Sequence, residues 1–458
     1  MLLLSALIVI GVAVLFFTLS RNRAIRSAGG QLASLHSRPS YHGTYSLLWT
    51  LLAGLGTLLA LSIGWAAVIE ASLMAEIAAA LPDEPRILHQ LVLNDAQSIA
   101  QGGIASTTDA LRERIAVSWA SAEQTRVWVT SALSIIVASG AGYLTYSKVD
   151  AAWRARNRSE TLIQVILLFC AVVAILTTIG IVFALLGTTL EFFANIGWRV
   201  DKFLFGLQWS PLAGVQEGQM DPDRVGAVPL FVGTFMITII AMLVAVPVGL
   251  FAAIYLSDFA SARTRAWAKP LLEILAGVPT VVYGFFAAIT VAPFVRDTGQ
   301  ALGIATSSSS ALAAGLVMGI MIIPFISSLS DDVINSVPQS LRDGSYGLGA
   351  TKAETIRQVV LPAALPGIVS ATLLGISRAV GETMIVVMAA GQGANLTWNP
   401  LEAVTTVTVQ IVMLYTGDTD LATASGPVFA LGFTLFCVTL GLNIVALRIV
   451  RRYRELYD

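Results

Sequence analysis

The sequence predicts an all-α protein that spans a membrane with about nine helices. Of its 458 residues, 56% are hydrophobic and only 12% are charged, whereas about a quarter of the residues in a soluble domain are charged. The apolar residues gather in runs of roughly 20, the length that crosses a bilayer as an α-helix. A net charge of −1 gives no indication of a nucleic-acid partner, and the lipid bilayer is the expected environment.

Nine apolar segments meet this length criterion. They lie at approximately 1–20, 45–69, 127–147, 161–187, 227–255, 270–294, 309–330, 364–391 and 426–449. The first has two interpretations, a cleaved signal peptide or a retained helix. No basic residue precedes its apolar run, Arg21 and Arg23 follow it, and no A-x-A cleavage site ends it cleanly, so a retained helix is favoured.

The distribution of Lys and Arg predicts the orientation of these helices. Alternate connections, beginning with the one after the first helix, carry more than twice as many Lys and Arg residues as the others. Cytoplasmic connections of membrane proteins carry this excess. The N-terminus is therefore predicted to be periplasmic and the C-terminus cytoplasmic, with the polar stretch 343–362 in the cytoplasm.

Two long connections are predicted on the outer side. The first, about 72–126, contains a stretch at 95–124 whose apolar positions predict a small helical element. These positions are Ile104, Leu111, Ile115 and Trp119. The second, 191–226, is rich in aromatic residues, namely Trp198, Phe203, Phe205 and Trp209. They favour an interfacial belt, and a lid over the mouth of a pathway is the alternative.

The polar stretch from Asp343 to Pro362 reads DGSYGLGATKAETIRQVVLP and lies between two apolar segments. Ser345 to Ile356 is predicted to form a short amphipathic helix that is broken at Gly349. Leu361 and Pro362 are predicted to end it, because proline has no backbone N–H and restricts the residue before it to extended conformations.

This stretch resembles the cytoplasmic loop of the permease subunits of ABC importers. The family pattern is Glu-Ala-Ala, three residues, Gly, nine residues, Ile, one residue, Leu-Pro. In this chain the pattern falls on Asp343, Gly344, Ser345, Gly349, Val359, Leu361 and Pro362. The spacing matches throughout, although the Glu-Ala-Ala triplet is degenerate. The resemblance implies that this loop is the coupling helix that docks on the ATPase subunit; an ordinary connection between membrane helices is the alternative.

Three charged residues lie within the apolar segments, and they are Glu273, Arg378 and Glu382. A charge at the centre of a bilayer costs about 2.5–3.5 kcal/mol on insertion scales, so such residues face a bundle interior or a water-filled cavity. The spacing of Arg378 and Glu382 predicts an ion pair on one helix face. A guanidinium can bind a phosphate through two charge-assisted hydrogen bonds, and a structural pair that joins two helices is the alternative.

The sequence Arg378-Ala-Val-Gly-Glu382-Thr383 is similar to a segment of PstC-type phosphate permeases. The resemblance extends to the segment that follows Glu273, where Gly277-Val-Pro279 precedes Val-Tyr-Gly. Pro279 is predicted to interrupt its helix. The resemblance implies that Arg378, Glu382, Thr383 and Glu273 lie on the phosphate pathway. For Glu273, an interfacial position close to the basic residues at 263–269 is the alternative.

These motifs identify the chain as a member of the PstC-type permeases, which belong to the binding-protein-dependent transport permeases. The resemblance implies a six-helix type I permease core at 161–458, preceded by a three-helix N-terminal membrane extension at 1–160. It also implies an inner-membrane location and an assembly with a PstA-type permease, two PstB-type ATPase subunits and a periplasmic PstS-type phosphate-binding protein. The sequence contains no G-x-x-x-x-G-K-[ST] motif, so ATP is expected to be hydrolysed by a separate subunit. No metal or cofactor is expected on this chain.

Other functions remain as alternatives. The chain is compatible with a PstA-type partner or a permease for another oxyanion, because the coupling loop does not separate these. An ATP-independent channel or carrier would be expected to show an inverted repeat, and none is evident in the sequence. An intramembrane enzyme would need a catalytic group at membrane depth, and no grouping of His, Asp and Glu or of Ser and Lys is found there.

Overall fold

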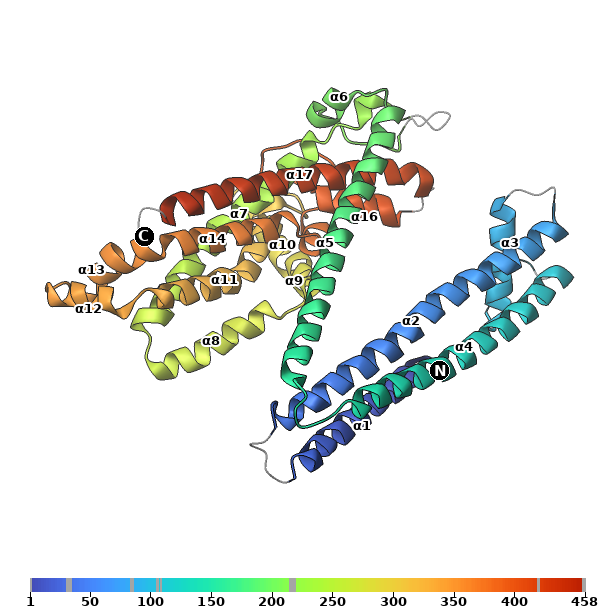
Figure 1. The fold of residues 1–458 in the computed structure, drawn as a ribbon. Coiled ribbons are helices and arrows are strands. Elements are labelled where there is room, and N and C mark those ends of the chain that lie inside the picture. Colours follow the sequence, from blue (N-terminus) through green and yellow to red (C-terminus); the bar gives the residue numbers. More distant parts are fainter. Residues whose placement is uncertain are drawn as a thin grey trace. The chain divides into compact units, whose positions relative to one another are not determined.

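The computed structural model describes residues 2–29, 35–82, 86–103, 107, 109–213, 220–417 and 421–454. Within these residues the secondary structure is helical, without a strand, as the sequence predicts (Figure 1). Nine of the described helices are long and apolar enough to cross a membrane, and they lie at the nine predicted segments. The chain forms two compact units, Met1–Ile175 and Leu176–Asp458. The boundary between these units in the sequence lies within helix α5 (Ala155–Asn195). The predicted division between residues 160 and 161 falls in the same helix, and that division stays a prediction.

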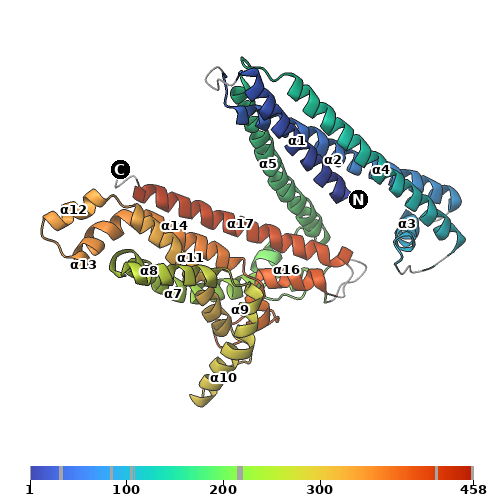
Figure 2. The ribbon, with the colours of Figure 1, turned by 90° about the horizontal axis from the view of Figure 1, so that it is seen from below.

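The first unit consists of three long helices packed side by side, a short fourth helix and the start of α5 (Figures 1 and 2). The helices are α1 (Leu2–Ser27), α2 (Pro39–Ala80), α3 (Arg86–Ala100) and α4 (Ala110–Ser147). Hydroxyl groups join the long helices inside the bundle, with Ser5 donating to Ser131 at 2.6 Å and Ser20 bonded to Ser46 at 2.7 Å. In a membrane, where the hydrophobic effect does not drive helices together, such hydrogen bonds contribute to helix association along with van der Waals packing.

The predicted outer loop at 72–126 is largely helical. Helix α2 continues to Ala80, α3 follows, and α4 begins at Ala110, so the helical element predicted there is confirmed and is longer than expected. Ile115 is fully buried, and Leu111 and Trp119 pack against the same cluster of apolar side chains. Ile104 lies outside the described residues. Arg112 joins α4 to α3 through an ion pair with Asp95, with Nε and Oδ2 2.9 Å apart.

The second unit contains the remainder of α5 and the later helices. These are α6 (Val200–Phe205), α7 (Val228–Ile254), α8 (Ala262–Ala276), α9 (Thr280–Phe286), α10 (Ala292–Ala301), α11 (Ala311–Ser336), α12 (Gln339–Gly347), α13 (Lys352–Thr355), α14 (Leu361–Val380), α15 (Met384–Ala389), α16 (Val407–Thr416) and α17 (Leu421–Arg454). Figures 1 and 2 both place α12 and α13 at one end of this unit and α16 at the other. The two ends can therefore be treated separately.

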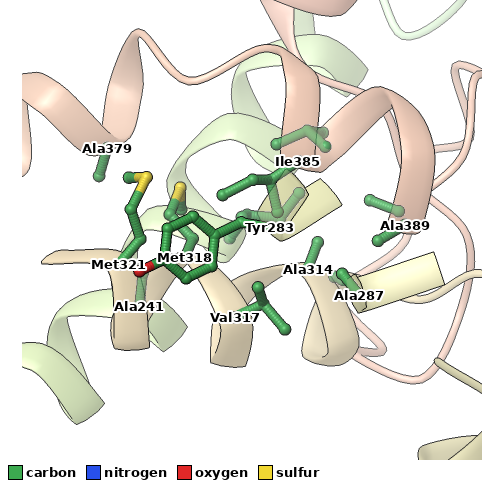
Figure 3. Packing of buried hydrophobic residues seen from close by; sticks show 14 of the residues in the cluster. Ala241, Tyr283, Ala287, Ala314, Val317, Met318, Met321, Ala379, Ile385 and Ala389 are labelled. Atoms are coloured by element: carbon green, nitrogen blue, oxygen red, sulfur yellow. The ribbon is translucent and has the colours of Figure 1, made fainter. Parts of the chain in front are cut away.

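Helices α7 and α11 form the centre of the second unit. The backbone of α11 approaches α7 closely at Gly315 and Gly319, where an added Cβ would lie 2.6 Å from a side-chain carbon of Ile240 and 2.9 Å from the carbonyl oxygen of Ala241. Close packing of this kind is typical of the G-x-x-x-G spacing. Around this contact, Tyr283 of α9 and Ile385 of α15 pack over α11 with Met318 and Met321, as Figure 3 shows.

Several helices of the second unit depart from regular α geometry. Three π-helical turns occur at Tyr255–Phe259, Ala287–Val291 and Ile356–Val360. Two helices are interrupted, between α8 and α9 at residues 277–279 and between α14 and α15 at residues 381–383. Pro279 stands before the first residue of α9, which confirms the predicted interruption. Widened turns and breaks of this kind are frequent at functional sites, and breaks at membrane depth occur where protein or water covers the freed backbone groups.

The aromatic connection at 191–226 divides into buried and exposed side chains. Phe203 and Trp209 are buried in a cluster with residues of α7, α16 and α17, whereas Trp198 and Phe205 are exposed. Trp209 donates from Nε1 to Oε1 of Gln410 at 3.1 Å. The buried pair therefore fixes this connection to the end of the second unit that carries α16, and the exposed pair remains available for the predicted interfacial belt.

Candidate functional site

The break between α14 and α15 contains two of the predicted pathway residues. Helix α14 ends at Val380, and α15 begins at Met384. Glu382 is 8% exposed, and its carboxylate accepts hydrogen bonds from the backbone N–H groups of Met384, at 3.0 Å, and Ile385, at 3.3 Å. The side chain of Thr383 is half-buried. Glu382 thus satisfies the first donors of α15 and holds the break in place.

The predicted ion pair between Arg378 and Glu382 is not formed. The prediction required one continuous helix, but the interruption after Val380 turns Glu382 away from the face of α14 and onto the backbone of α15. Arg378 is exposed, and its Cζ atom lies 5.9 Å from the ring centroid of Phe325 on α11. Within the described part of the chain this guanidinium has no carboxylate partner, so its hydrogen-bonding groups are available to a ligand.

A cavity of about 240 Å³ lies between α8 and α11. It is lined by Leu256, Lys269, Leu272, Glu273, Ala276, Pro324, Phe325, Ser327, Ser328, Leu329 and Asp331. Glu273 is exposed and belongs to this lining. Phe325 lies on the wall of the cavity and also beneath Arg378. Phe325 thus links the two predicted pathway residues, because it lines the cavity together with Glu273 and lies against the guanidinium of Arg378.

The polar loop that resembles a coupling helix folds as two short helices with a sharp turn between them. Gly349 has φ +87°, a left-handed conformation that glycine adopts without a steric penalty, and the predicted break at this residue is confirmed. Asp343 accepts a hydrogen bond from Gln339 on α12, Gly344 is exposed, and Ser345 bonds to Thr355 at 2.9 Å. Three large apolar side chains point outward from this loop, namely Leu341, Tyr346 and Leu348, the last of which is 91% exposed.

The prediction that Leu361 and Pro362 end this helix is wrong. The chain is helical without interruption from Lys352 to Val380, and Pro362 lies in the first turn of α14. The π-helical turn Ile356–Val360 immediately precedes it, and Leu361 bonds back to the carbonyl of Ile356. This wider turn accommodates a residue that has no N–H to donate. Leu361 packs with Val360 against the ends of α7 and α11.

Sequence reasoning missed two buried carboxylates at the same end of the unit. Asp258 forms an ion pair with Arg342 of α12, and their side chains are only 7% and 10% exposed. Arg342 also donates to the carbonyl of Ile334 at 2.9 Å. The pair ties the first part of the coupling-helix loop to the end of α7. No local pattern indicates it, because its partners are 84 residues apart.

Asp331 on α11 is the second missed carboxylate. Its Oδ2 atom lies 3.0 Å from both Nη2 of Arg265 and Nζ of Lys269, and Asn335 donates to its Oδ1 at 2.8 Å. The hydrogen bond to Asp331 raises the pKa of Lys269 above its ordinary value, so this amine stays charged at neutral pH. The sequence contained a sign of this cluster. Arg265 and Lys269 are four residues apart and share a helix face, and Asp331 and Asp332 directly follow the apolar segment predicted at 309–330.

Comparison with known proteins gives two family matches. Residues 4–177 match a family described as a phosphate ATP-binding cassette transporter. Residues 245–455 match the family described as the binding-protein-dependent transport system inner membrane component. The first match covers the first unit and the second covers most of the second unit, including every candidate site residue named above.

Three relatives are similar to this chain over its later part. The probable ABC transporter permease protein YqgH of Bacillus subtilis is 33% identical over 301 residues, which are 66% of this chain and 93% of the relative. The phosphate transport system permease protein PstC of Haemophilus influenzae is 30% identical over 60% of this chain and 90% of its own length. PstC of Mesorhizobium japonicum is 28% identical over 66% and 90%, respectively.

Proposed function

Because this chain belongs to the family of binding-protein-dependent transport system inner membrane components, we propose that it is the membrane-spanning subunit of an ATP-driven phosphate importer. Relatives named as phosphate transport permeases support the choice of phosphate. The observation that carries the proposal is Arg378, an exposed guanidinium without a carboxylate partner in the described residues, which lies against Phe325 on the wall of the cavity between α8 and α11. Its planar fork can donate two hydrogen bonds to one phosphate.

The remaining pathway residues take different roles in this proposal. Glu382 and Thr383 form the break that leaves Arg378 at the end of α14, and the bound carboxylate of Glu382 keeps the short helix α15 in position. Glu273 lines the same cavity as Phe325. A carboxylate close to the path weakens the binding of an anion, and weak binding favours release in a transporter.

The test measures phosphate uptake normalised to the amount of assembled complex. Arg378→Gln is expected to insert and assemble but to lose uptake, and Arg378→Lys should recover little, because an ammonium group cannot reproduce the planar fork. Arg263→Gln, which removes an exposed cation at the start of α8, is the matched control and should keep uptake. Substantial uptake by the Arg378→Gln complex would contradict the proposed contact. Uptake of sulfate by a wild-type complex that does not take up phosphate would instead identify another oxyanion as the substrate.

Coupling to an ATPase is assigned to the loop that contains Asp343, Gly344, Ser345, Gly349, Leu361 and Pro362. Leu348 is the most exposed large apolar side chain of this loop, and exposed apolar patches of this kind mark protein contacts. The chain itself contains no Walker A motif. We expect Leu348→Asp to release a PstB-type ATPase subunit during purification, whereas Leu302→Asp, at a 72% exposed position after α10, should not. Equal ATPase retention by both variants would remove this assignment.

The proposed assembly has a PstA-type permease, two PstB-type ATPase subunits and a periplasmic PstS-type binding protein, with the N-terminus periplasmic and the C-terminus cytoplasmic. The excess of Lys and Arg on alternate connections supports the orientation. In a background without Cys170 and Cys437, a cysteine at Gly102 should react with an impermeant thiol reagent applied from outside, and one at Ala353 should not. The reverse labelling pattern would invert the topology.

A further inference from the structure

One end of the first unit carries a strong excess of positive charge. The turn between α1 and α2 and the turn between α4 and α5 bring together eight basic residues and two acidic ones. The basic residues are Arg21, Arg23, Arg26, Arg38, Lys148, Arg154, Arg156 and Arg158, and the acidic ones are Asp150 and Glu160. Clusters of basic residues next to membrane helices attract anionic lipids at about 1 kcal/mol per residue. The charge alone does not define a site, and the structure adds a groove.

The groove lies between α2 and α5 and has a volume of about 480 Å³. Tyr45 and Trp49 line it from one face of α2, and Asn157, Arg158, Thr161, Leu162 and Val165 line it from one face of α5. Its lining changes character along α5. Asn157, Arg158 and Thr161 lie in the first two turns and are polar, whereas Leu162 and Val165 follow deeper in the apolar helix and stand beside Trp49.

Arg158 is suited to hold an anion at the polar end of this groove. It is exposed, and its Cζ atom lies 5.8 Å from the ring centroid of Trp153, so an aromatic ring positions the side chain, and no carboxylate in the described part of the chain is paired with it. Within the described residues Arg156, in contrast, is paired with Glu160 at 2.7 Å. The start of α5, a helix of 41 residues, also directs its positive dipole end toward this position.

We propose that this groove binds one anionic phospholipid, with the headgroup phosphate on Arg158, Asn157 and Thr161 and one acyl chain along Leu162, Val165 and Trp49. The occupant is set by the lining. A polar, cationic end that continues into an apolar channel matches a lipid, whose phosphate and acyl chain are covalently joined. Trp49 is 41% exposed and Val165 is 56% exposed, so both can contact an acyl chain. Tyr45, an amphipathic side chain, lies where the two parts of the lipid meet.

The test uses the full chain in vesicles of phosphatidylcholine. A minor fraction of the lipid carries brominated acyl chains, which quench tryptophan fluorescence on contact. In one set of vesicles the brominated lipid is phosphatidylglycerol, and in the other set it is phosphatidylcholine. The chain has nine tryptophans, so the difference between the wild type and Trp49→Phe isolates the signal of the groove. We expect brominated phosphatidylglycerol to quench this signal at a lower mole fraction than brominated phosphatidylcholine.

Arg158→Gln should reduce the preference for phosphatidylglycerol about tenfold, because it removes a direct charge-assisted contact to the headgroup, a larger loss than the roughly fivefold expected from diffuse attraction alone. Arg158→Lys should keep most of the preference. Arg154→Gln is the matched control, because it removes an equal charge from an exposed residue at the same end that does not line the groove. An equal reduction in Arg154→Gln would show diffuse attraction and overturn the site.

Three further outcomes would also overturn the proposal. Equal quenching of the wild type by both brominated lipids would show that the groove has no anion selectivity. No quenching of Trp49 by either lipid would show that protein covers the groove. Relief of the phosphatidylglycerol quenching by inorganic phosphate would identify free phosphate as the ligand in place of a lipid headgroup. The comparison between lipids uses the unaltered chain, so the test does not depend on the folding of any variant at Arg158.

Discussion

The second unit contains buried carboxylates in two regions that satisfy them in different ways. At the break between α14 and α15, Glu382 accepts hydrogen bonds from two backbone N–H groups of the next helix. At the end that carries α12 and α13, Asp258 and Asp331 are paired with arginine and lysine side chains from other helices. One arrangement is local, and the other joins helices that are distant in sequence.

The difference indicates what each region is built to hold. A carboxylate on backbone donors stabilises one turn of one helix, and its loss affects that turn. A buried carboxylate paired with a cation from another helix fixes two elements together, and the loss of one partner leaves the other charge without compensation. The loop proposed to receive force from an ATPase is therefore attached by the charge pair of Asp258 and Arg342, whereas the break next to Arg378 is held by one capping side chain.

The largest effect is expected for Arg342→Gln. This change leaves the carboxylate of Asp258, whose side chain is 7% exposed, without its cation. Removing one partner of a buried pair costs about 3–5 kcal/mol, so we expect much less folded protein in the membrane and a lower unfolding temperature. The double variant Asp258→Asn with Arg342→Gln should recover most of the loss, because no unpaired charge remains. A double variant as unstable as the single one would show that Arg342 acts through its other contacts.

An intermediate effect is expected for Asp331→Asn. The substitution removes the charge-assisted hydrogen bonds from Arg265 and Lys269, but these two side chains are each 35% exposed and regain water when the carboxylate is lost. We expect a loss of about 1–3 kcal/mol in the free energy of unfolding. Asp332→Asn is the control, because Asp332 is 66% exposed, and its expected change is below about 0.5 kcal/mol. Unfolding in increasing denaturant measures both, and similar losses for the two variants would contradict a special role of Asp331.

The smallest effect is expected at Glu382. Glu382→Ala removes the cap of α15 and should cost about 0.5–2 kcal/mol, whereas Glu382→Gln retains an acceptor oxygen and should cost less. The pair of variants also separates the cap from the charge. If Glu382 serves phosphate transport only through the position of α15, uptake per assembled complex should survive in Glu382→Gln. Loss of uptake in a stable Glu382→Gln complex would show that the negative charge itself is needed.

The sequence was sufficient to predict the fold class and the nine membrane segments. Apolar length is a local property, and it depends little on which helices finally pack together. The interruptions at Pro279 and Gly349 were predictable for a similar reason, because a missing N–H and a positive φ are properties of single residues. The prediction at Pro362 failed because a π-helical turn before it removed the conflict.

The candidate site was less accessible to sequence reasoning. The spacing of Arg378 and Glu382 predicts an ion pair only if the helix continues through both residues. Gly381 is the one poor helix former between them in the sequence, and a single glycine does not predict an interruption. The partners of Asp331 and Asp258 are 66 and 84 residues away. In the sequence Asp258 and Asp331 lie at the ends of apolar segments, where charged residues are ordinary. Their burial becomes evident only in the structure, where α8 packs against α11 and Arg342 of α12 reaches the end of α7.

The π-helical turn Ile356–Val360 sets the rotational phase between the coupling-helix loop and α14. An α-helix rotates by about 100° for each residue, and a π turn contains one residue more than an α turn. The extra residue therefore determines the direction in which Leu348 and Tyr346 point when α14 is held by its contacts with α11. Deleting Gln358 would turn the loop through about this angle while leaving its own sequence intact, so ATPase docking should be lost although every docking residue is still present.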